Sequence, residues 1–206
     1  MLSLPDSPGR ALIACPFFSL LQNEAQVFLL RLQSGDGTNR LTGECVLALH
    51  AALGEIRCDR KPIVIAGNSL YFSAGADLGE IAAFDALSAY KFSLTGQDLM
   101  RSIEQFPAPV YAAISGYCMG GGVDLALACH RRIAAPHAIF GHRGATLGLI
   151  TGWGGTQRLP RLVGKATAQE LLVAAERITA HRAFEIGLID ALSEDPVAEA
   201  LRRLST

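Results

Sequence analysis

The chain has 206 residues, of which 50% are hydrophobic and 18% charged, and its formal net charge at pH 7 is −1. This length is enough for one domain with a full core, and the near-neutral charge gives no electrostatic reason to expect a nucleic-acid partner. The apolar share is somewhat larger than a domain of this size requires, which indicates surface buried against further subunits.

The first half of the chain alternates strand-like and helix-like segments. Three segments have the continuous apolar character of buried strands: 27–32, 62–66 and 110–114. Two segments carry the apolar spacing and composition of a helix: 43–56 and about 86–104. Pro107 and Pro109 end the second helix, and with four glycines they interrupt the long uncharged stretch 105–123. That stretch therefore does not predict a membrane-spanning helix, and we expect no membrane partner.

The second half becomes mainly helical. Two short strands are predicted around Pro136 and His137: 133–135 and 138–140. Two patterns predict helix starts: a capping box at 167–170, and an N-cap followed by proline at 195–196. No low-complexity linker separates the parts. The sequence therefore predicts a single α/β domain over 1–206, with a core at about 25–165 and a helical tail at about 166–206.

The segment from Gly116 to Asp124 is the most informative part of the sequence. Its three consecutive glycines follow an apolar run and precede a helix-like stretch. A helix start without Cβ atoms can present free N–H groups to a ligand, and the carbonyl oxygen of an acyl group that becomes negative in a transition state needs such donors. The glycines could instead only let a helix pack closely on a strand. The small-residue loop at 74–77 favours an oxyanion hole, because it supplies a second set of bare backbone donors.

Three motifs resemble, in order and spacing, those of the crotonase or enoyl-CoA hydratase/isomerase superfamily. They are FSAGADL at 72–78, GYCMGGGVDLALAC at 116–129 and GLITGWGGTQRLPRLVG at 148–164. The resemblance extends from about Phe28 to Leu192. It implies an α/β fold built as a spiral of ββα units that binds a coenzyme A thioester. It also implies a homo-oligomer, a trimer or hexamer, and no cofactor beyond the coenzyme A of the substrate.

The resemblance assigns roles to individual positions. The thioester oxygen is expected between the backbone N–H groups of Ala76 and Gly121. Asp124 takes the place of one acid–base carboxylate, and the second maps onto Gly144, which cannot transfer a proton. Further substrate contacts are expected at six positions: Ala74, Gly75, Asp77, Leu78, Gly120 and Gly144. The naphthoyl-CoA synthase branch also has glycine at the second position, but its characteristic aspartate falls on Thr151 here.

His142 lies two residues before the glycine that replaces the second carboxylate. A histidine titrates near neutral pH, so His142 is a candidate acid or base, although such a side chain at a strand end often faces solvent or stabilises its loop. Members of the superfamily also continue for several helices beyond the position of Ser205, which implies a shortened C-terminal helical region here.

The expected function is therefore an acyl-CoA-processing enzyme of the enoyl-CoA hydratase/isomerase type. Two alternatives stay open: a non-catalytic acyl-CoA-binding homologue, and a decarboxylase or hydrolase that uses the same enolate hole. Sequence patterns favour neither a dinucleotide site nor a metal site, since the glycine run is not G-x-G-x-x-G and no His/Cys cluster has metal-ligand spacing.

The number and spacing of the cysteines indicate the redox state of the compartment in which the protein is expected. The five cysteines are odd in number and form no C-x-x-C pair, which predicts free thiols in a reducing cytoplasm. Cys118 has no adjacent base in sequence and is expected to be a packing residue. Asp6 lies where a signal peptide would carry positive charge, so no cleaved signal peptide is expected.

Overall fold

A computed structural model describes residues 10–205, so the prediction that rests on Asp6 lies outside the described residues. The largest sheet has seven strands in the order β1-β2-β3-β5-β8-β10-β13. These strands are β1 (Arg10–Ala14), β2 (Phe18–Gln22), β3 (Phe28–Leu32), β5 (Ile63–Ala66), β8 (Val110–Ile114), β10 (Arg131–Ala134) and β13 (Ala191–Leu192). The first three pair antiparallel, and every later pairing is parallel.

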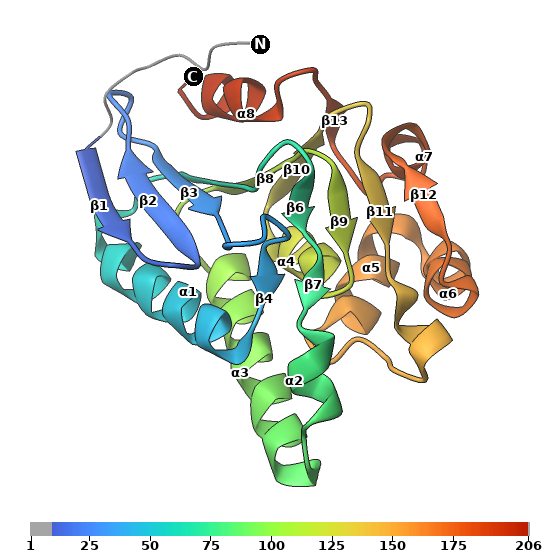
Figure 1. The fold of residues 1–206 in the computed structure, drawn as a ribbon. Coiled ribbons are helices and arrows are strands. Elements are labelled where there is room, and N and C mark those ends of the chain that lie inside the picture. The colour runs from blue at the N-terminus through green and yellow to red at the C-terminus, as the bar shows by residue number, and fades with distance from the viewer. Residues whose placement is uncertain (1–9, 206) are drawn as a thin grey trace.

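A second sheet lies beside the first, as Figure 1 shows. It has the order β12-β11-β9-β6. Its strands are β6 (Tyr71–Ser73), β9 (Tyr117–Met119), β11 (Ile139–Gly141) and β12 (Arg177–Thr179). A two-stranded parallel pair joins β4 (Arg40–Leu41) to β7 (Gly75–Ala76). The chain therefore passes repeatedly from the large sheet to the small sheet and then into a helix, which confirms the predicted crotonase-like spiral of ββα units.

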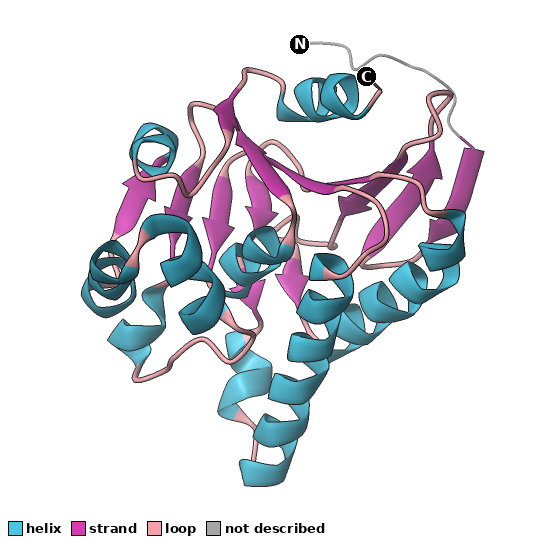
Figure 2. Ribbon diagram, turned by 180° about the vertical axis from the view of Figure 1, so that it is seen from behind, coloured by secondary structure: helices cyan, strands magenta, loops and turns pink. Residues whose placement is uncertain are grey.

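Helices pack around this spiral, except α4, whose residues are all buried. The first five in chain order are α1 (Gly43–Ile56), α2 (Leu78–Ala82), α3 (Ala86–Glu104), α4 (Gly121–Ala128) and α5 (Gly155–Val163). Short 3-10 turns are η1 (Arg57–Asp59) and η2 (Arg143–Leu147), and the last helices are α6 (Lys165–Ala174), α7 (Ala180–Glu185) and α8 (Pro196–Leu204). In Figures 1 and 2, α2 and the start of α3 extend away from the body of the molecule.

The core lies on both faces of the large sheet. The main cluster fills the space between this sheet and helices α1, α3 and α4, and it includes fully buried Phe28, Phe72 and Leu99. A smaller cluster around Val64 and Ile133 packs under α8, which crosses the opposite face in Figure 1. Over residues 10–205, no helix is both long enough and apolar enough to cross a membrane.

The predicted elements agree best with the structure where the sequence pattern extends over many residues. Both predicted helices of the first half have the expected bounds, 43–56 and 86–104. Asp195 caps α8 by accepting a hydrogen bond from the N–H of Ala198 at 2.9 Å, as its sequence pattern predicted. The capping-box prediction was wrong, because α6 begins at Lys165 rather than after Thr167. The region predicted as a helical tail also contributes two strands, β12 and β13.

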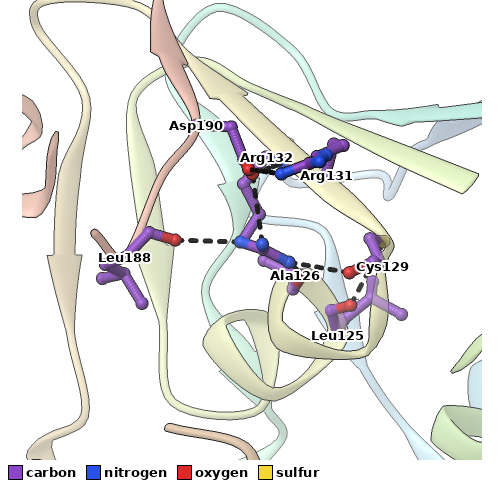
Figure 3. Close-up of polar contacts among 7 residues, drawn as sticks. All are labelled: Leu125, Ala126, Cys129, Arg131, Arg132, Leu188 and Asp190. Atoms are coloured by element: carbon purple, nitrogen blue, oxygen red, sulfur yellow. Dashed lines mark hydrogen bonds and ion pairs between the residues drawn. The ribbon is translucent and has the colours of Figure 1, made fainter. Parts of the chain in front are cut away.

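A buried arginine fixes the end of α4, as Figure 3 shows. Arg132 is 4% exposed, and its guanidinium donates to the carbonyls of Cys129 at 2.7 Å and Leu188 at 2.9 Å. It also donates to the Asp190 carboxylate at 3.1 Å. Burial lowers the pKa of Arg132, and the charge of Asp190 opposes that effect. The ion pair thus ties the C-terminal end of α4 to the segment before β13.

Replacing Asp190 by asparagine is expected to lower the free energy of unfolding by about 3 kcal/mol or more, because it leaves a buried cation without its counter-ion. Urea denaturation measures the change. Arg131, whose side chain is 61% exposed, pairs with the same carboxylate at 2.6 Å and supplies a matched control. Arg131→Gln is expected to cost at most about 1 kcal/mol, since an exposed ion pair is weak. Equal destabilisation by the two variants would contradict this interpretation.

Candidate active site

A cavity of about 560 Å³ opens where the two glycine-containing loops meet α2 and α3. Apolar side chains from α2, α3 and the loop between them form one wall, with Ile81, Phe84 and Phe92 among them. The opposite wall is formed by the chain around η2 and by the segment 149–153. Eight of the residues predicted for the site line this cavity: Ala74, Ala76, Leu78, Gly120, Gly121, Asp124, His142 and Gly144.

The two loops bring backbone groups together at the base of the cavity. A Cβ added to Gly75 would lie 2.9 Å from the nitrogen of Gly121, and one added to Gly121 would lie 3.2 Å from the nitrogen of Ala76. Gly121 is the first residue of α4, so its N–H has no acceptor within that helix. The nitrogens of Ala76 and Gly121 therefore approach the same space, as two oxyanion-hole donors must.

Buried polar side chains hold the upstream loop in this place. Ser73 is fully buried; its hydroxyl donates to the carbonyl of Asn39 at 2.7 Å and accepts from the N–H of Gly75 at 3.0 Å. Asn39 is 2% exposed, and its side-chain amide donates to the carbonyl of Tyr71 at 2.9 Å. The pairing of β4 with β7 adds a second tether. The loop that carries Ala76 is therefore fixed before any ligand binds.

The glycine run also has the packing role that the sequence left open. A Cβ on Gly122 would lie 2.8 Å from the carbonyl oxygen of Ser73, so this glycine lets α4 pack closely on β6. A Cβ on Gly121 would lie 2.5 Å from the indole of Trp153. Gly120 has a φ of 51°, a left-handed value that favours glycine. Each glycine of the run is thus needed for a different reason.

Asp124 lies one turn beyond Gly121 on α4 and is 2% exposed. Its Oδ2 accepts a hydrogen bond of 2.6 Å from the hydroxyl of Thr151. Its Oδ1 has no hydrogen-bond partner among the described residues. Of the described residues that line the cavity, Asp124 alone carries a carboxylate. A buried carboxylate with an unused oxygen, next to backbone donors, can exchange a proton with a substrate held there.

His142 lies beside this carboxylate. Its Nε2 is 3.7 Å from Oδ2 of Asp124, which is too long for a hydrogen bond, and it has no other hydrogen-bond partner among the described residues. The His142 side chain is 12% exposed, so it is turned into the protein rather than into solvent. The structure therefore brings together the two titratable side chains that the sequence singled out, Asp124 and His142.

Gly144 lies on η2, close to the backbone of Leu149. A Cβ added there would lie 2.8 Å from the carbonyl oxygen of Leu149 and 3.6 Å from Nδ1 of His142. A glutamate at this position could not be accommodated without moving the segment that follows η2. The missing second carboxylate is therefore accompanied by a local backbone arrangement that leaves no room for one.

Two predicted contact residues lie outside the wall of the cavity. Gly75 is buried beneath it, with a φ of 92°. Asp77 caps α2 by accepting from the N–H of Glu80 at 3.0 Å, and its carboxylate also lies 3.5 Å from Arg40. These roles explain both residues structurally, and their predicted contacts with a substrate stay predictions.

Comparison with known proteins decides the family. Residues 22–205 match the model of the enoyl-CoA hydratase/isomerase family. The chain belongs to this family. It is 38% identical over 174 residues to crotonyl-CoA hydratase of Syntrophomonas wolfei, covering 83% of this chain and 67% of that one. It is 33% identical over 178 residues to short-chain-enoyl-CoA hydratase of Clostridium acetobutylicum, covering 85% and 68%.

Solved structures agree with this assignment. The enoyl-CoA hydratase of Bacillus anthracis superposes with a TM-score of 0.83 at 33% identity, over 95% of this chain and 74% of that one. One from Geobacillus kaustophilus gives a TM-score of 0.89 at 28% identity, over 95% and 77%. The chain spans about two thirds of the length of the curated relatives named above. As the motifs predicted, the protein is of the acyl-CoA-processing, enoyl-CoA hydratase/isomerase type.

Sequence reasoning missed three residues of this candidate site. Thr151 appeared only as the position of another branch's aspartate, whereas its hydroxyl binds Asp124. Gly155 was only one position of the third motif, but a Cβ there would lie 2.2 Å from Oδ1 of Asp124. Trp153 was not singled out, although it lines the cavity. Only the tertiary contacts reveal these roles.

Two other titratable side chains, Cys118 and His130, have structural surroundings. Cys118 is fully buried, and burial raises the pKa of its thiol well above the ordinary value, so it is a packing residue as predicted. His130 accepts a hydrogen bond from the N–H of Val110 at 2.9 Å, a structural role. Within the described part of the chain, no group of three or more His, Cys, Asp or Glu side chains could hold a metal ion.

Proposed function

We propose that this chain adds water to 2-enoyl-CoA thioesters, with Asp124 as its single acid–base carboxylate. The observation that carries the proposal is the position of this buried carboxylate one turn beyond Gly121, in the same cavity as the nitrogen of Ala76. The printed names of relatives, crotonyl-CoA hydratase and short-chain-enoyl-CoA hydratase, support this choice of reaction.

One carboxylate can complete the proposed reaction. As the oxygen of water bonds to the β-carbon, Asp124 takes one proton from that water. The electron pair of the double bond moves onto the thioester oxygen, and the N–H groups of Ala76 and Gly121 stabilise the resulting enolate. Asp124 then returns the proton to the α-carbon, so that hydroxyl and hydrogen are both added and the carboxylate is regenerated.

His142 supports this cycle in our proposal. Its Nε2 lies 3.7 Å from Oδ2 of Asp124 and needs only a small side-chain movement to share the proton that the carboxylate carries. The proposed steps use side chains, backbone N–H groups and water, with no cofactor beyond the coenzyme A of the substrate. His142→Gln tests this role, because glutamine can still donate a hydrogen bond but cannot transfer a proton as imidazole does.

Thr151 is proposed to position Asp124. Its hydroxyl donates the one side-chain hydrogen bond that Asp124 receives within the described structure, at 2.6 Å. Thr151→Val is expected to lower kcat by about 10- to 100-fold with little change in KM, since a hydrogen bond to a charged group contributes about 1.5–3 kcal/mol. Thr151→Ser keeps the hydroxyl and is expected to restore most of the loss in a steady-state assay. A serine variant as impaired as the valine variant would contradict the positioning role.

The alternative reaction is decarboxylation of a malonyl-type thioester. Arg143 lines the cavity and could hold a substrate carboxylate, and a decarboxylase needs the enolate hole more than a second acid. A non-catalytic acyl-CoA-binding homologue is the other possibility, motivated by Gly144. The discriminating experiment offers crotonyl-CoA, 3-enoyl-CoA and malonyl-CoA in parallel and follows the products by mass spectrometry.

Hydration of crotonyl-CoA would support the main proposal, and isomerisation or decarboxylation alone would replace it. Binding without any product would favour the non-catalytic homologue. We also propose a homo-oligomer, which sedimentation analysis tests. A reducing cytoplasmic location is proposed as well, and it is compatible with the free state of all the cysteines in the described residues.

A further inference from the structure

The indole of Trp153 fills a slot between α3 and α4. A Cβ added to Gly96 of α3 would lie 2.0 Å from the indole Nε1 and 2.2 Å from Cδ1. A Cβ added to Gly121 of α4 would lie 2.5 Å from Cζ3 at the other edge of the ring. The ring therefore reaches from one helix to the other, and each helix has a glycine where the ring touches it.

Other contacts hold the ring in this orientation. Trp153 is 3% exposed, and its Nε1 donates to the carbonyl of Phe92 at 3.3 Å. The rings of Trp153 and Phe92 have centroids 5.1 Å apart, and those of Phe92 and Phe84 are 5.0 Å apart. These three residues, all in the cavity lining, form a continuous aromatic wall. Trp153 is the end of that wall nearest Gly121.

This end of the wall lies where the acyl group must be. The reacting carbons have to face Asp124, the one carboxylate among the described lining residues, while the thioester oxygen faces Gly121. Trp153 touches Gly121, and it follows the Asp124 partner Thr151 by two residues in the chain. Carbons beyond the reacting pair are therefore directed toward the indole, which closes the passage between α3 and α4.

We propose that Trp153 determines the acyl-chain length this protein accepts, and that it selects short acyl groups by closing the passage between Gly96 and Gly121. The inference rests on the proposed function, because it assumes that an acyl thioester occupies the cavity. Replacing the indole by a smaller side chain opens the space between the two glycines and lets a longer chain extend into the protein.

The experiment compares wild type, Trp153→Phe and Trp153→Ala on 2-enoyl-CoA thioesters of four, six, eight and ten carbons. Wild type is expected to favour the four-carbon substrate in kcat/KM by about ten-fold or more over the ten-carbon one, as a hydrophobic pocket of fixed size allows. Trp153→Ala is expected to reverse that preference, and Trp153→Phe to give an intermediate ratio. Phe18→Leu removes buried volume at a residue outside the cavity lining and is the matched control, with an unchanged ratio.

Binding provides a readout that does not depend on turnover. Isothermal titration with butyryl-CoA and decanoyl-CoA, which lack the double bond, gives the ratio of dissociation constants for each variant. Trp153 is also the single tryptophan of the chain, so butyryl-CoA is expected to change its fluorescence in wild type. If no variant turns over substrate, but the ratio of the two dissociation constants favours butyryl-CoA and changes in Trp153→Ala, the proposed reaction is wrong and this inference stands. The inference would be overturned if wild type and Trp153→Ala had the same ratio of kcat/KM values between short and long substrates and the same ratio of dissociation constants.

Discussion

Replacing Asp124 by asparagine is expected to lower kcat for hydration of crotonyl-CoA by about 10²- to 10⁴-fold, the usual contribution of a positioned acid–base group. Asparagine has nearly the same shape and can still accept from the hydroxyl of Thr151, so the cavity is retained while the proton acceptor is lost. Because Gly144 cannot take over proton transfer, no second carboxylate in the described lining reduces the effect.

Steady-state kinetics measures this loss, with butyryl-CoA binding as the test that the site is intact. Asp98 supplies a matched control, since its side chain is 52% exposed and it pairs with neighbouring Arg101 on the surface of α3. Asp98→Asn is expected to have wild-type kcat. A wild-type rate for Asp124→Asn would show that the reaction does not pass through this carboxylate.

Replacing Gly121 by proline is expected to lower kcat by about 10²- to 10³-fold, because it deletes one of the two backbone donors to the enolate. Proline is tolerated at the first position of a helix, where the N–H lacks a helical acceptor, and Gly121 begins α4. The helix should therefore survive while the oxyanion hole loses a donor and part of its space.

The matched control is Gly121→Ala. Alanine introduces the same Cβ, which would lie 2.5 Å from the Trp153 ring, but it keeps the N–H. The loss specific to the donor is therefore the difference in kcat between the two variants, and far-ultraviolet circular dichroism checks that both keep their helices. Equal kcat values for the proline and alanine variants would mean that crowding of Trp153, rather than the missing N–H, causes the defect.

The two loops that line the cavity at Ala76 and Gly121 could be predicted from sequence because their signal is local. Runs such as Gly120 to Gly122 are uncommon, and each glycine is needed by backbone geometry or close packing at its own position. The surroundings of Asp124 could not be predicted in the same way. Thr151 reaches it across 27 residues of chain, and the contact depends on how η2 and α5 dock against α4. Such distances in sequence leave no periodic pattern.

The errors in secondary structure have similar causes. Gly164 precedes α6 with a φ of 81°, so the helix begins at a backbone turn and the capping pattern at Thr167 falls inside its first turn. β12 is three residues long and exists because it pairs antiparallel with β11, from Ile139↔Thr179 to Gly141↔Arg177. Tertiary pairing of this kind overrides local preference in short strands.

The donors proposed for an oxyanion hole are main-chain atoms from separate turns of the spiral, at Ala76 after β6 and at Gly121 after β9. Their positions are set by the backbone path of the fold, with the side chains of Ser73 and Asn39 holding the loop of Ala76. Substitutions at neighbouring positions such as 142, 144 and 151 can therefore alter proton transfer while the capacity to stabilise an enolate persists. In this architecture, new reactions can arise by exchanging a few side chains around an unchanged electrostatic centre.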